Sequence, residues 1–368
     1  MTGFEQRTSK KSPTLLVMAG GTGGHIFPGI AVAEMLKNKG WSIHWLGTEK
    51  RMEADIVPQH GFDISFINIA GVRNKSWLER LKTPFKLLQS VIQSIAILRK
   101  VKPDVVLGMG GYASAPGGFA AWVMRIPLVL HEQNAVAGMT NRYLSKIATS
   151  VLSAFPNAFA NGVKFEVVGN PLRKEITNLK PVVPKHPSTS KKVLVVGGSL
   201  GAKILNDTVP QALKQIHLQN IDVWHQTGRD NQAAVLANYQ EFGMAEDKVK
   251  VTEFIEDMAA AYQWADIVIC RAGALTVSEL AMAAKPAIFV PLPHAVDDHQ
   301  TKNAMYLVSC GAAKLLSQKE FNGTTLAQML NSLFISDSVV QSMVKSAHDA
   351  AHADATNRVA DTCAELVH

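Results

Sequence analysis

The sequence predicts an α/β protein built from two doubly wound parallel-sheet domains, and three observations predict it. Apolar, strand-like runs alternate with helical patterns along the chain, as in parallel sheets with crossover helices. A glycine-rich strand-to-helix loop occurs at Gly20 and again 177 positions later at Gly197. The length of 368 residues also exceeds what one ordinary core holds. We therefore expect two similar domains whose strand ends face a shared cleft.

The elements can be assigned in order along the chain. The first domain is expected over 13–172 and the second over 191–348, joined by a polar, proline-bearing linker at 173–190. The last helical pattern, Val339–Leu366, is expected to cross back so that about 349–368 packs on the first domain. Strands are expected at Thr14–Ala19, Ile43–Leu46, Ile64–Ile67, Asp104–Leu107, Pro127–Leu130, Lys191–Val196, Asp222–His225, Val249–Thr252, Asp266–Cys270, Ala287–Val290 and Ala312–Leu315.

Composition and charge narrow the classes of protein and partner. Hydrophobic residues make up 47% and charged residues 18%, which describes a well-buried globular chain. Three cysteines without metal-ligand spacing, and a polar stretch 1–13 without the apolar core of a signal peptide, indicate the cytoplasm. Residues 1–172 hold 19 Lys and Arg against 10 Asp and Glu, which favours an anionic surface or ligand. No nucleic-acid-binding motif accompanies this charge, so nucleic acid is not an expected partner.

The first glycine-rich loop, Gly20 to Gly24, is followed by His25 and has the form of an anion site. A strand that turns sharply into a helix leaves the first helical amides unpaired, and glycines let a phosphate approach them. The loop lacks both the G-x-G-x-x-G dinucleotide fingerprint and a Walker A sequence. The alternative is a tight turn that only packs a helix on a strand.

The second domain contains a similar opening after the strand that ends at Cys270. Gly273 begins a small-residue turn whose amides can hold a pyrophosphate, and Glu279 falls one to two turns into the next helix. Its carboxylate can accept hydrogen bonds from both hydroxyls of a ribose. The alternative is a purely structural role, because a Glu near the start of any helix stabilises it through the helix dipole. The chain has no Asp-x-Asp pair. We therefore expect helix N-termini and donors such as Arg173, rather than a metal, to stabilise leaving-group charge.

Two more loops of the first domain should lie at the same sheet edge as Gly20. They are Gly108–Tyr112 and His131–Asn134, and each follows an apolar strand. Polar loops that gather on one rim make a site. His131 and Glu132 can act there chemically, or they can be structural groups that tie the loops together.

At this point the residues carry a family resemblance. The strings Met18–His25, Gly108–Tyr112, His131–Asn134, Gly169–Pro171, Val195–Ser199 and Gly273–Glu279 resemble, in order, the MurG family of bacterial N-acetylglucosaminyltransferases. The resemblance covers both domains and implies a GT-B fold with a deep cleft. It also implies an inverting transfer of N-acetylglucosamine from UDP-N-acetylglucosamine to the 4-hydroxyl of the muramyl sugar in lipid I, giving lipid II and UDP for peptidoglycan synthesis.

Site residues follow from the resemblance, position by position, with no cofactor or metal required. The register of Pro293 to Gln300 departs from the family pattern by an apparent extra residue, so Gln300 is the weakest of these assignments. The implied contacts to UDP-N-acetylglucosamine are Thr22, Gly23, Gly24, Asn134, Arg173, Ser199, Ile255, Ala274, Leu275, Thr276, Val277, Ser278, Glu279 and Gln300. The acceptor-side candidates are Gly20, Gly21, Gly110, Gly111, Tyr112, His131 and Glu132.

His25 is the candidate general base. The ordinary pKa of an imidazole, about 6.5, suits removal of a proton from the acceptor hydroxyl. Two other roles for His25 remain open: it can bind the pyrophosphate of the acceptor, or cap the loop.

A lipid-linked acceptor requires contact with a membrane, and the segment from Arg73 to Lys102 is suited to it. This segment holds eight basic residues against one acid. Pro84 is expected to start a new helix, and from Phe85 on the apolar stripe is expected to pack mainly on the sheet. The patch candidates for anionic inner-leaflet lipid are Arg73, Lys75, Trp77, Leu78, Leu81, Lys82 and Phe85.

The expected location is therefore peripheral, on the cytoplasmic face of the bacterial inner membrane, where cell-wall synthesis or division proteins are possible partners. Three alternatives remain. An NAD-dependent oxidoreductase fits the fold class, although the dinucleotide fingerprint fails. A UDP-N-acetylglucosamine 2-epimerase shares the architecture and the donor. A non-catalytic nucleotide-sugar-binding protein is the third.

Overall fold

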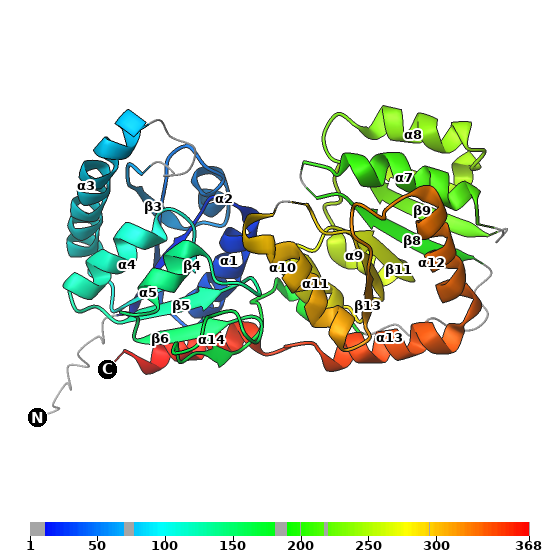
Figure 1. Ribbon diagram of the computed structural model, residues 1–368. Helices are drawn as coiled ribbons and strands as arrows, with labels where there is room; N and C mark the ends of the chain where they lie inside the picture. Colours follow the sequence, from blue (N-terminus) through cyan, green and yellow to red (C-terminus); the bar gives the residue numbers. More distant parts are fainter. Residues whose placement is uncertain are drawn as a thin grey trace, which may run out of the picture.

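Two parallel β-sheets, each covered by helices, form the two halves of the chain in the computed structural model (Figure 1). The structure describes residues 12–69, 77–180, 190–198, 200–216, 220–293 and 295–367. All strand pairings within both sheets are parallel. The predicted fold class, two doubly wound Rossmann-like domains, is confirmed.

The first sheet has seven strands in the order β3-β2-β1-β4-β5-β6-β7. Its central strands β1 and β4 are buried along their whole length, as strands covered on both faces must be. The elements are β1 (Thr14–Ala19), α1 (Gly23–Asn38), β2 (Ser42–Gly47), α2 (Glu53–Gln59), β3 (Asp63–Phe66), α3 (Trp77–Val101), β4 (Val105–Gly110), α4 (Ser114–Val123), β5 (Leu128–Glu132), α5 (Met139–Leu144), β6 (Ser150–Ser153), β7 (Glu166–Val167) and α6 (Lys174–Thr177).

The second sheet has six strands in the order β10-β9-β8-β11-β12-β13. The elements are β8 (Lys191–Val196), α7 (Lys203–Lys214), β9 (Ile221–Gln226), α8 (Gln232–Glu241), the 3-10 turn η1 (Glu246–Lys248), β10 (Val249–Thr252), α9 (Met258–Trp264), β11 (Ile267–Cys270), α10 (Ala274–Met282), β12 (Ala287–Phe289), the turn η2 (Val296–Asp298), α11 (His299–Ser309), β13 (Ala313–Leu315), α12 (Gly323–Ile335), α13 (Asp337–Asp349) and α14 (Ala355–Glu365).

In both sheets the strand order reverses at one point, between β1 and β4 and between β8 and β11. Connections leave such a switch point in opposite directions, so the loops at the carboxyl ends of these strands diverge and leave space for a ligand. The loop that begins at Gly20 follows β1, and the turn at Gly273 follows β11. The fold therefore places both predicted loops at switch points.

The chain ends on the first domain. Helix α13 lies along the second domain, and after residues 350–354 helix α14 packs on α1 (Figure 1). Val359, Ala360 and Cys363 of α14 are buried in the same core as Ile30 and Ala33 of α1. The C-terminal segment thus ties the two domains together a second time.

Three expectations about elements were wrong. The strands β6 and β7 at the edge of the first sheet were not predicted, because they are short and weakly apolar. The pattern Val339–Leu366 is not one helix but parts of α13 and α14, with residues 350–354 between them. Pro84 does not start a helix, because α3 continues through it, and Pro84 lies in the exposed part of that helix.

A buried histidine ties two helices to strand β9 of the second sheet. His225 of β9 lies with Nδ1 2.9 Å from the hydroxyl of Tyr239 and Nε2 3.1 Å from Oδ1 of Asn206. The amide nitrogen of Asn206 donates to the carbonyl of Thr227, so its Oδ1 is the acceptor for His225. This bonding places hydrogen on Nε2, and burial lowers the pKa of His225 to about 3, so the ring is neutral at physiological pH.

The histidine gives the protein a specific acid sensitivity. As the pH falls from about 6.5 toward about 4, the unfolded chain gains a proton at His225 that the folded chain refuses, so stability falls. We expect His225→Gln to flatten this decline by up to about 1.4 kcal/mol per pH unit in urea unfolding, even though it is less stable at neutral pH. The exposed His348, changed to Gln, serves as the control. An unchanged slope in His225→Gln would contradict this assignment.

Candidate active site

The buried carboxylate of Glu53 holds the loop after β1 in place through a hydrogen bond. Glu53, in the first turn of α2, is 1% exposed, and its Oε2 accepts a hydrogen bond from the amide of Gly21 at 2.9 Å. Its Oε1 accepts from the amide and the hydroxyl of Thr48, at 3.1 and 2.6 Å. The Gly21 amide is therefore already bound. The first-turn amides of α1, at Gly23 and Gly24, are the donors left for an anion.

Two glycines at this edge of the first sheet, Gly111 and Gly24, lack a side chain for different reasons. Gly111 has φ of +91°, and a Cβ there would lie 2.4 Å from the carbonyl oxygen of Gly20. Only glycine allows this approach of the loops after β1 and β4. At Gly24 the nearest atom to an added Cβ is Oγ1 of Thr22 at 3.6 Å, so packing does not require glycine there. The bare backbone at Gly24 leaves room for a ligand, which favours the anion site over the packing turn.

The imidazole of His25 is fixed on one side by the first domain. Its Nδ1 lies 2.8 Å from Oε1 of Gln133. The ring also lies against the backbone of Gly110, where an added Cβ would be 2.9 Å from Cε1. Within the described ranges no hydrogen bond reaches Nε2 of His25. The side chain is half-buried, so this second nitrogen is the one that can meet a ligand.

His131 is a structural group of the strand β5. It is fully buried, with Nε2 2.8 Å from the carbonyl oxygen of Gly169 and Nδ1 3.1 Å from Nε2 of Gln133. Burial lowers the pKa of His131 to about 4, only partly opposed by the bond to Gly169. The ring is therefore neutral, with both nitrogens bound inside the protein.

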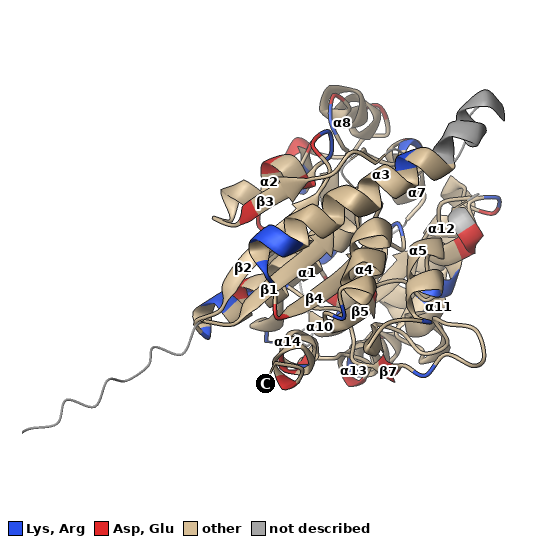
Figure 2. Cartoon of the chain, turned by 90° about the vertical axis from the view of Figure 1, so that its left-hand side faces the viewer, with Lys and Arg blue, Asp and Glu red and all other residues tan. Residues whose placement is uncertain are grey.

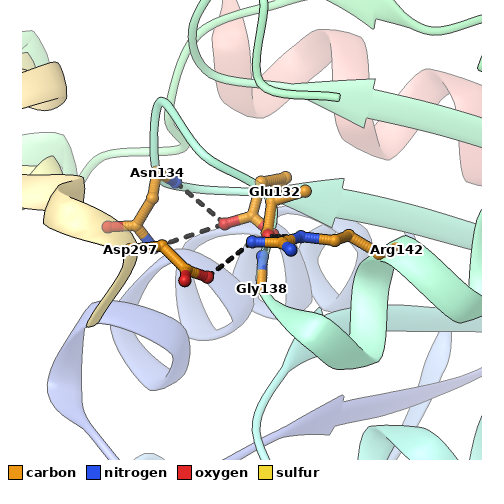
Figure 3. A network of polar contacts seen from close by, with 6 residues as sticks. Glu132, Asn134, Gly138, Arg142 and Asp297 are labelled. Carbon is orange, nitrogen blue, oxygen red and sulfur yellow. Dashed lines mark hydrogen bonds and ion pairs between the residues drawn. The ribbon is translucent and has the colours of Figure 1, made fainter. Parts of the chain in front are cut away.

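Glu132 shapes the loop that follows β5. One carboxylate oxygen accepts from the amide and the side-chain nitrogen of Asn134, at 3.0 and 3.3 Å. The other accepts from the amide of Gly138 at 3.0 Å and from Nδ2 of Asn141 at 2.8 Å (Figure 3). Direct acceptor contact, one of the two roles expected for His131 and Glu132, does not fit their burial. Both instead hold the loops in place.

The two domains touch through side chains of this same loop region. Oδ1 of Asn134 accepts from Nδ2 of Asn303 at 3.2 Å, and Oδ1 of Asn303 accepts from the amide of Ala135 at 2.7 Å. Farther out, the guanidinium of Arg142 on α5 lies 2.5 Å from a carboxylate oxygen of Asp297 (Figure 3). The loop after β5, which belongs to the first domain, therefore also contacts the second domain.

The second-domain half of the site is the start of α10. Gly273 is the residue before the helix, which begins at Ala274. Two turns in, Oε2 of Glu279 accepts from the hydroxyl of Tyr262 at 2.9 Å, and Oε1 lies 3.4 Å from Nη2 of Arg173. Burial raises the pKa of Glu279, while Arg173 and Tyr262 oppose that rise. The guanidinium of Arg173 also lies 5.6 Å from the ring centre of Phe27 on α1. Arg173 therefore joins the two helices whose N-termini form the site.

The remaining predicted residues are distributed over both domains. Ala274, Leu275, Thr276, Val277 and Ser278 form the first turns of α10. Gln300 lies in the first turn of α11, and its Oε1 accepts from the amide of Leu292 at 2.9 Å. Ile255 lies half-buried between β10 and α9, and Tyr112 is exposed beneath the guanidinium of Arg51. Ser199 lies outside the described residues.

Sequence reasoning missed four residues that hold this site. Asn170 links the two domains, because its Nδ2 lies within hydrogen-bond distance of the carbonyl of Gln133 and of Oγ of Ser278, at 3.1 and 3.0 Å. Asn170 and Gln133 lie inside quoted motifs, so a signal existed for them. The others have none, since an acid in a helix turn or a tyrosine on a helix is ordinary. The four are Glu53, Gln133, Asn170 and Tyr262.

The predicted membrane patch is described only in part. Arg73 and Lys75 lie outside the described residues, and the side chains of Trp77, Leu78, Leu81 and Lys82 are likewise not described. Phe85, Leu88 and Ile92 are 77%, 59% and 58% exposed, at positions that share one face of α3. The expectation that this stripe packs on the sheet was wrong. The opposite face, with Ser90, Ser94 and Leu98, is buried instead.

The neighbouring helix also exposes large apolar side chains. Helix α3 packs beside α4, where Phe119 and Trp122 are also exposed (Figure 2). Lys86 and Lys100 lie in the described part of α3, and Figure 2 shows basic residues toward both ends of that part. In the described part of the chain no helix is long and apolar enough to cross a membrane. The same described residues contain no group of three His, Cys, Asp or Glu that could hold a metal ion.

Two Rossmann-like domains with two helix N-termini at their junction have the architecture of the GT-B class. Comparison with known proteins agrees. Residues 15–153 match the glycosyltransferase family 28 N-terminal domain, and residues 192–359 match its C-terminal domain. The chain belongs to glycosyltransferase family 28.

Individual relatives cover the chain almost from end to end. It is 60% identical to a protein of Colwellia psychrerythraea named UDP-N-acetylglucosamine–N-acetylmuramyl-(pentapeptide) pyrophosphoryl-undecaprenol N-acetylglucosamine transferase, over 96% of this chain and 92% of that protein. A protein of Shewanella frigidimarina with the same name is 54% identical, over 96% and 97%. The crystal structure of MurG from Acinetobacter baumannii superposes with a TM-score of 0.85 at 40% identity, covering 96% of this chain and 99% of that one.

Proposed function

We propose that this protein transfers N-acetylglucosamine from UDP-N-acetylglucosamine to the 4-hydroxyl of the muramyl sugar of lipid I, giving lipid II and UDP. The observation that carries the proposal is the position of Arg173 in this member of glycosyltransferase family 28. Arg173 contacts both Phe27 near the start of α1 and Glu279 on α10. One cation thus lies against the first two turns of both α1 and α10. That combination suits the diphosphate of a nucleotide sugar.

The donor nucleotide is assigned to the second domain. A carboxylate has about four lone-pair sites, and Tyr262 and Arg173 occupy one on each oxygen of Glu279. Each oxygen can therefore accept one more bond, which matches the two hydroxyls of a ribose. The pyrophosphate is assigned to the first-turn amides of α10, and the uracil to the backbone near Ile255. The remaining donor contacts proposed are Thr22, Gly23, Gly24, Asn134, Ser199 and Gln300.

The chemistry proposed is one in-line displacement. The 4-hydroxyl oxygen of the acceptor forms a bond to the anomeric carbon, its proton passes to Nε2 of His25, and the bond from that carbon to the phosphate oxygen breaks. The electron pair of the broken bond leaves with UDP. We propose that Arg173 and the helix N-termini of α1 and α10 stabilise the charge on UDP without a metal ion.

The acceptor is lipid-linked, so we also propose a peripheral position on the cytoplasmic face of the bacterial inner membrane. The exposed stripe of Phe85, Leu88 and Ile92 on α3 supports this, with Lys86 beside it for anionic headgroups. The first domain, which carries this stripe, is assigned to the acceptor through Gly110, Gly111 and Tyr112. Proteins of cell-wall synthesis or division are proposed as further partners.

The reaction itself can be tested with the purified protein. We expect UDP to be released from UDP-N-acetylglucosamine only when a lipid I analogue is present, together with a disaccharide product. Conversion of UDP-N-acetylglucosamine to its 2-epimer without an acceptor would instead indicate the 2-epimerase alternative. Binding of the donor without turnover under any condition would indicate a non-catalytic protein.

The base role of His25 predicts a specific kinetic loss. His25→Ala should lower kcat by ~10² or more, while KM for either substrate changes by only a few-fold, since the base acts in the transition state. His60→Ala, which removes an exposed histidine of the same domain, is the matched control. A loss confined to acceptor affinity would instead make His25 a pyrophosphate ligand.

The membrane patch predicts a loss of vesicle binding. The triple variant Phe85→Ser, Leu88→Ser and Ile92→Ser should bind phosphatidylglycerol vesicles roughly tenfold more weakly, because inserting three apolar side chains is worth more than 1.4 kcal/mol. A second variant, in which Trp77, Leu81, Lys75 and Lys82 are replaced by Ser, should show a comparable loss. Ile335→Ser, at an exposed position on α12, is the control. Unchanged sedimentation with vesicles would reject the patch.

A further inference from the structure

We propose that Gln133 is a positioning residue that fixes the tautomer of His25, so that the proton lies on Nδ1 and Nε2 is the basic atom. The evidence is a chain of four groups that begins at the carbonyl of Gly169 and passes through His131 and Gln133 to His25. This inference rests on the proposed role of His25 as the base, but the proton position itself can be tested separately.

The first link sets the proton on His131. The carbonyl oxygen of Gly169 can only accept a hydrogen bond, and it lies 2.8 Å from Nε2 of His131. That nitrogen therefore carries the hydrogen. The ring is fully buried and neutral, so its other nitrogen, Nδ1, presents a lone pair.

The second link orients the amide of Gln133. Its Nε2 lies 3.1 Å from Nδ1 of His131 and 3.1 Å from the carbonyl oxygen of His131, and both of these atoms accept. The reversed amide would direct its oxygen at two acceptors, inside a side chain that is almost completely buried. The nitrogen of Gln133 therefore faces His131, and its oxygen faces the other way.

The third link fixes which ring nitrogen of His25 carries the proton. Oε1 of Gln133 lies 2.8 Å from Nδ1 of His25, and an amide oxygen can only accept. Nδ1 of His25 must then be the donor. A neutral imidazole with hydrogen on Nδ1 keeps its lone pair on Nε2, which is the nitrogen that no described residue binds. The base is thus held in one tautomer before the substrate arrives.

The first group of this hydrogen-bonded series, Gly169, is next to a residue that contacts both domains. Gly169 is followed by Asn170, whose Nδ2 lies 3.0 Å from Oγ of Ser278 on α10 and 3.1 Å from the carbonyl of Gln133. The residues that set the tautomer of His25 are therefore supported by α10, the helix proposed to bind the donor. This placement makes the orientation of Gln133 part of the assembled two-domain site.

Few charged groups lie on the elements around His25. Glu53 of α2 is bound to Gly21 and Thr48, and Arg173 lies over the ring of Phe27, two residues after His25 on α1. Arg51 lies over Tyr112, which follows Gly111 in the adjoining loop. His131 is neutral. A change at position 133 is therefore the substitution expected to act most directly on the ring of His25.

The test combines nitrogen-15 spectra of the histidines with kinetics. In the wild-type protein we expect His25 to show hydrogen on Nδ1. Gln133→Met, which keeps the length of the side chain, should lose that signature and lower kcat roughly ten- to hundredfold, with KM within about twofold. In the His25→Ala background the same substitution should cause no further loss, because Gln133 acts through His25.

Two companion variants keep the test decisive. Gln133→Glu retains an acceptor for His25 and adds a negative charge that favours the imidazolium, so the acid limb of the kcat/KM profile should move to higher pH. It also serves if Gln133→Met fails to fold. Asn206→Leu removes the equivalent amide from the buried His225 in the other domain, and should cost stability without changing the His25 spectrum.

The outcomes separate the two ideas. Hydrogen on Nε2 of His25 in the wild-type protein would overturn the tautomer assignment whatever the kinetics show. An equal loss of kcat from Gln133→Met with and without His25 would mean that Gln133 is merely structural. Full turnover in His25→Ala would refute the base role in the proposed function, while a spectrum with hydrogen on Nδ1 would still support the orientation by Gln133.

Discussion

The approach of Gly111 to the carbonyl of Gly20 is the constraint on which the first-domain half of the site depends. These residues follow β4 and β1, the two strands between which the sheet order reverses. Their loops would otherwise diverge, and the bare backbone at Gly111 lets them touch. The same contact brings Gly110 against the ring of His25, which then reaches Gln133. A side chain at position 111 would separate the loops and move the imidazole.

Buried carboxylates hold these loops by accepting hydrogen bonds, not by meeting a substrate. Glu53 accepts from three groups and Glu132 from four, all within the first domain. An isolated buried charge would be costly, but several N–H and O–H donors on one carboxylate offset that cost and fix its neighbours. Both acids therefore make the loops rigid. Rigid loops suit a site that must hold an imidazole in a single tautomer.

Much of the fold could be predicted because the strands are buried on both faces. Thr14–Ala19 and Lys191–Val196 agree with β1 and β8 to the residue, since a central parallel strand appears in sequence as an apolar run between turns. The short strands β6 and β7 give too little of this signal. The stripe from Phe85 to Ile92 shows a second limit, because helical spacing predicts which residues share a face but not which face meets the sheet.

The site was predictable only where its chemistry is local. Glycine loops at strand ends and Glu279 near the start of a helix can be found from sequence, because neighbouring residues create the signal. The hydrogen bond of Tyr262 to Glu279 and that of Glu53 to Gly21 cannot, because tertiary folding alone brings those residues together.

Arg173 shows how such a long-range contact serves two domains at once. It binds Glu279 through one nitrogen at 3.4 Å and lies over Phe27 with its guanidinium face, so most of its five N–H groups need no part in either contact. Its side chain is more exposed than that of Glu279, at 38% against 11%. The cation is thus oriented by the buried carboxylate and still open to an anion. A lysine here would supply the charge but neither the stacking nor the fixed fork of donors.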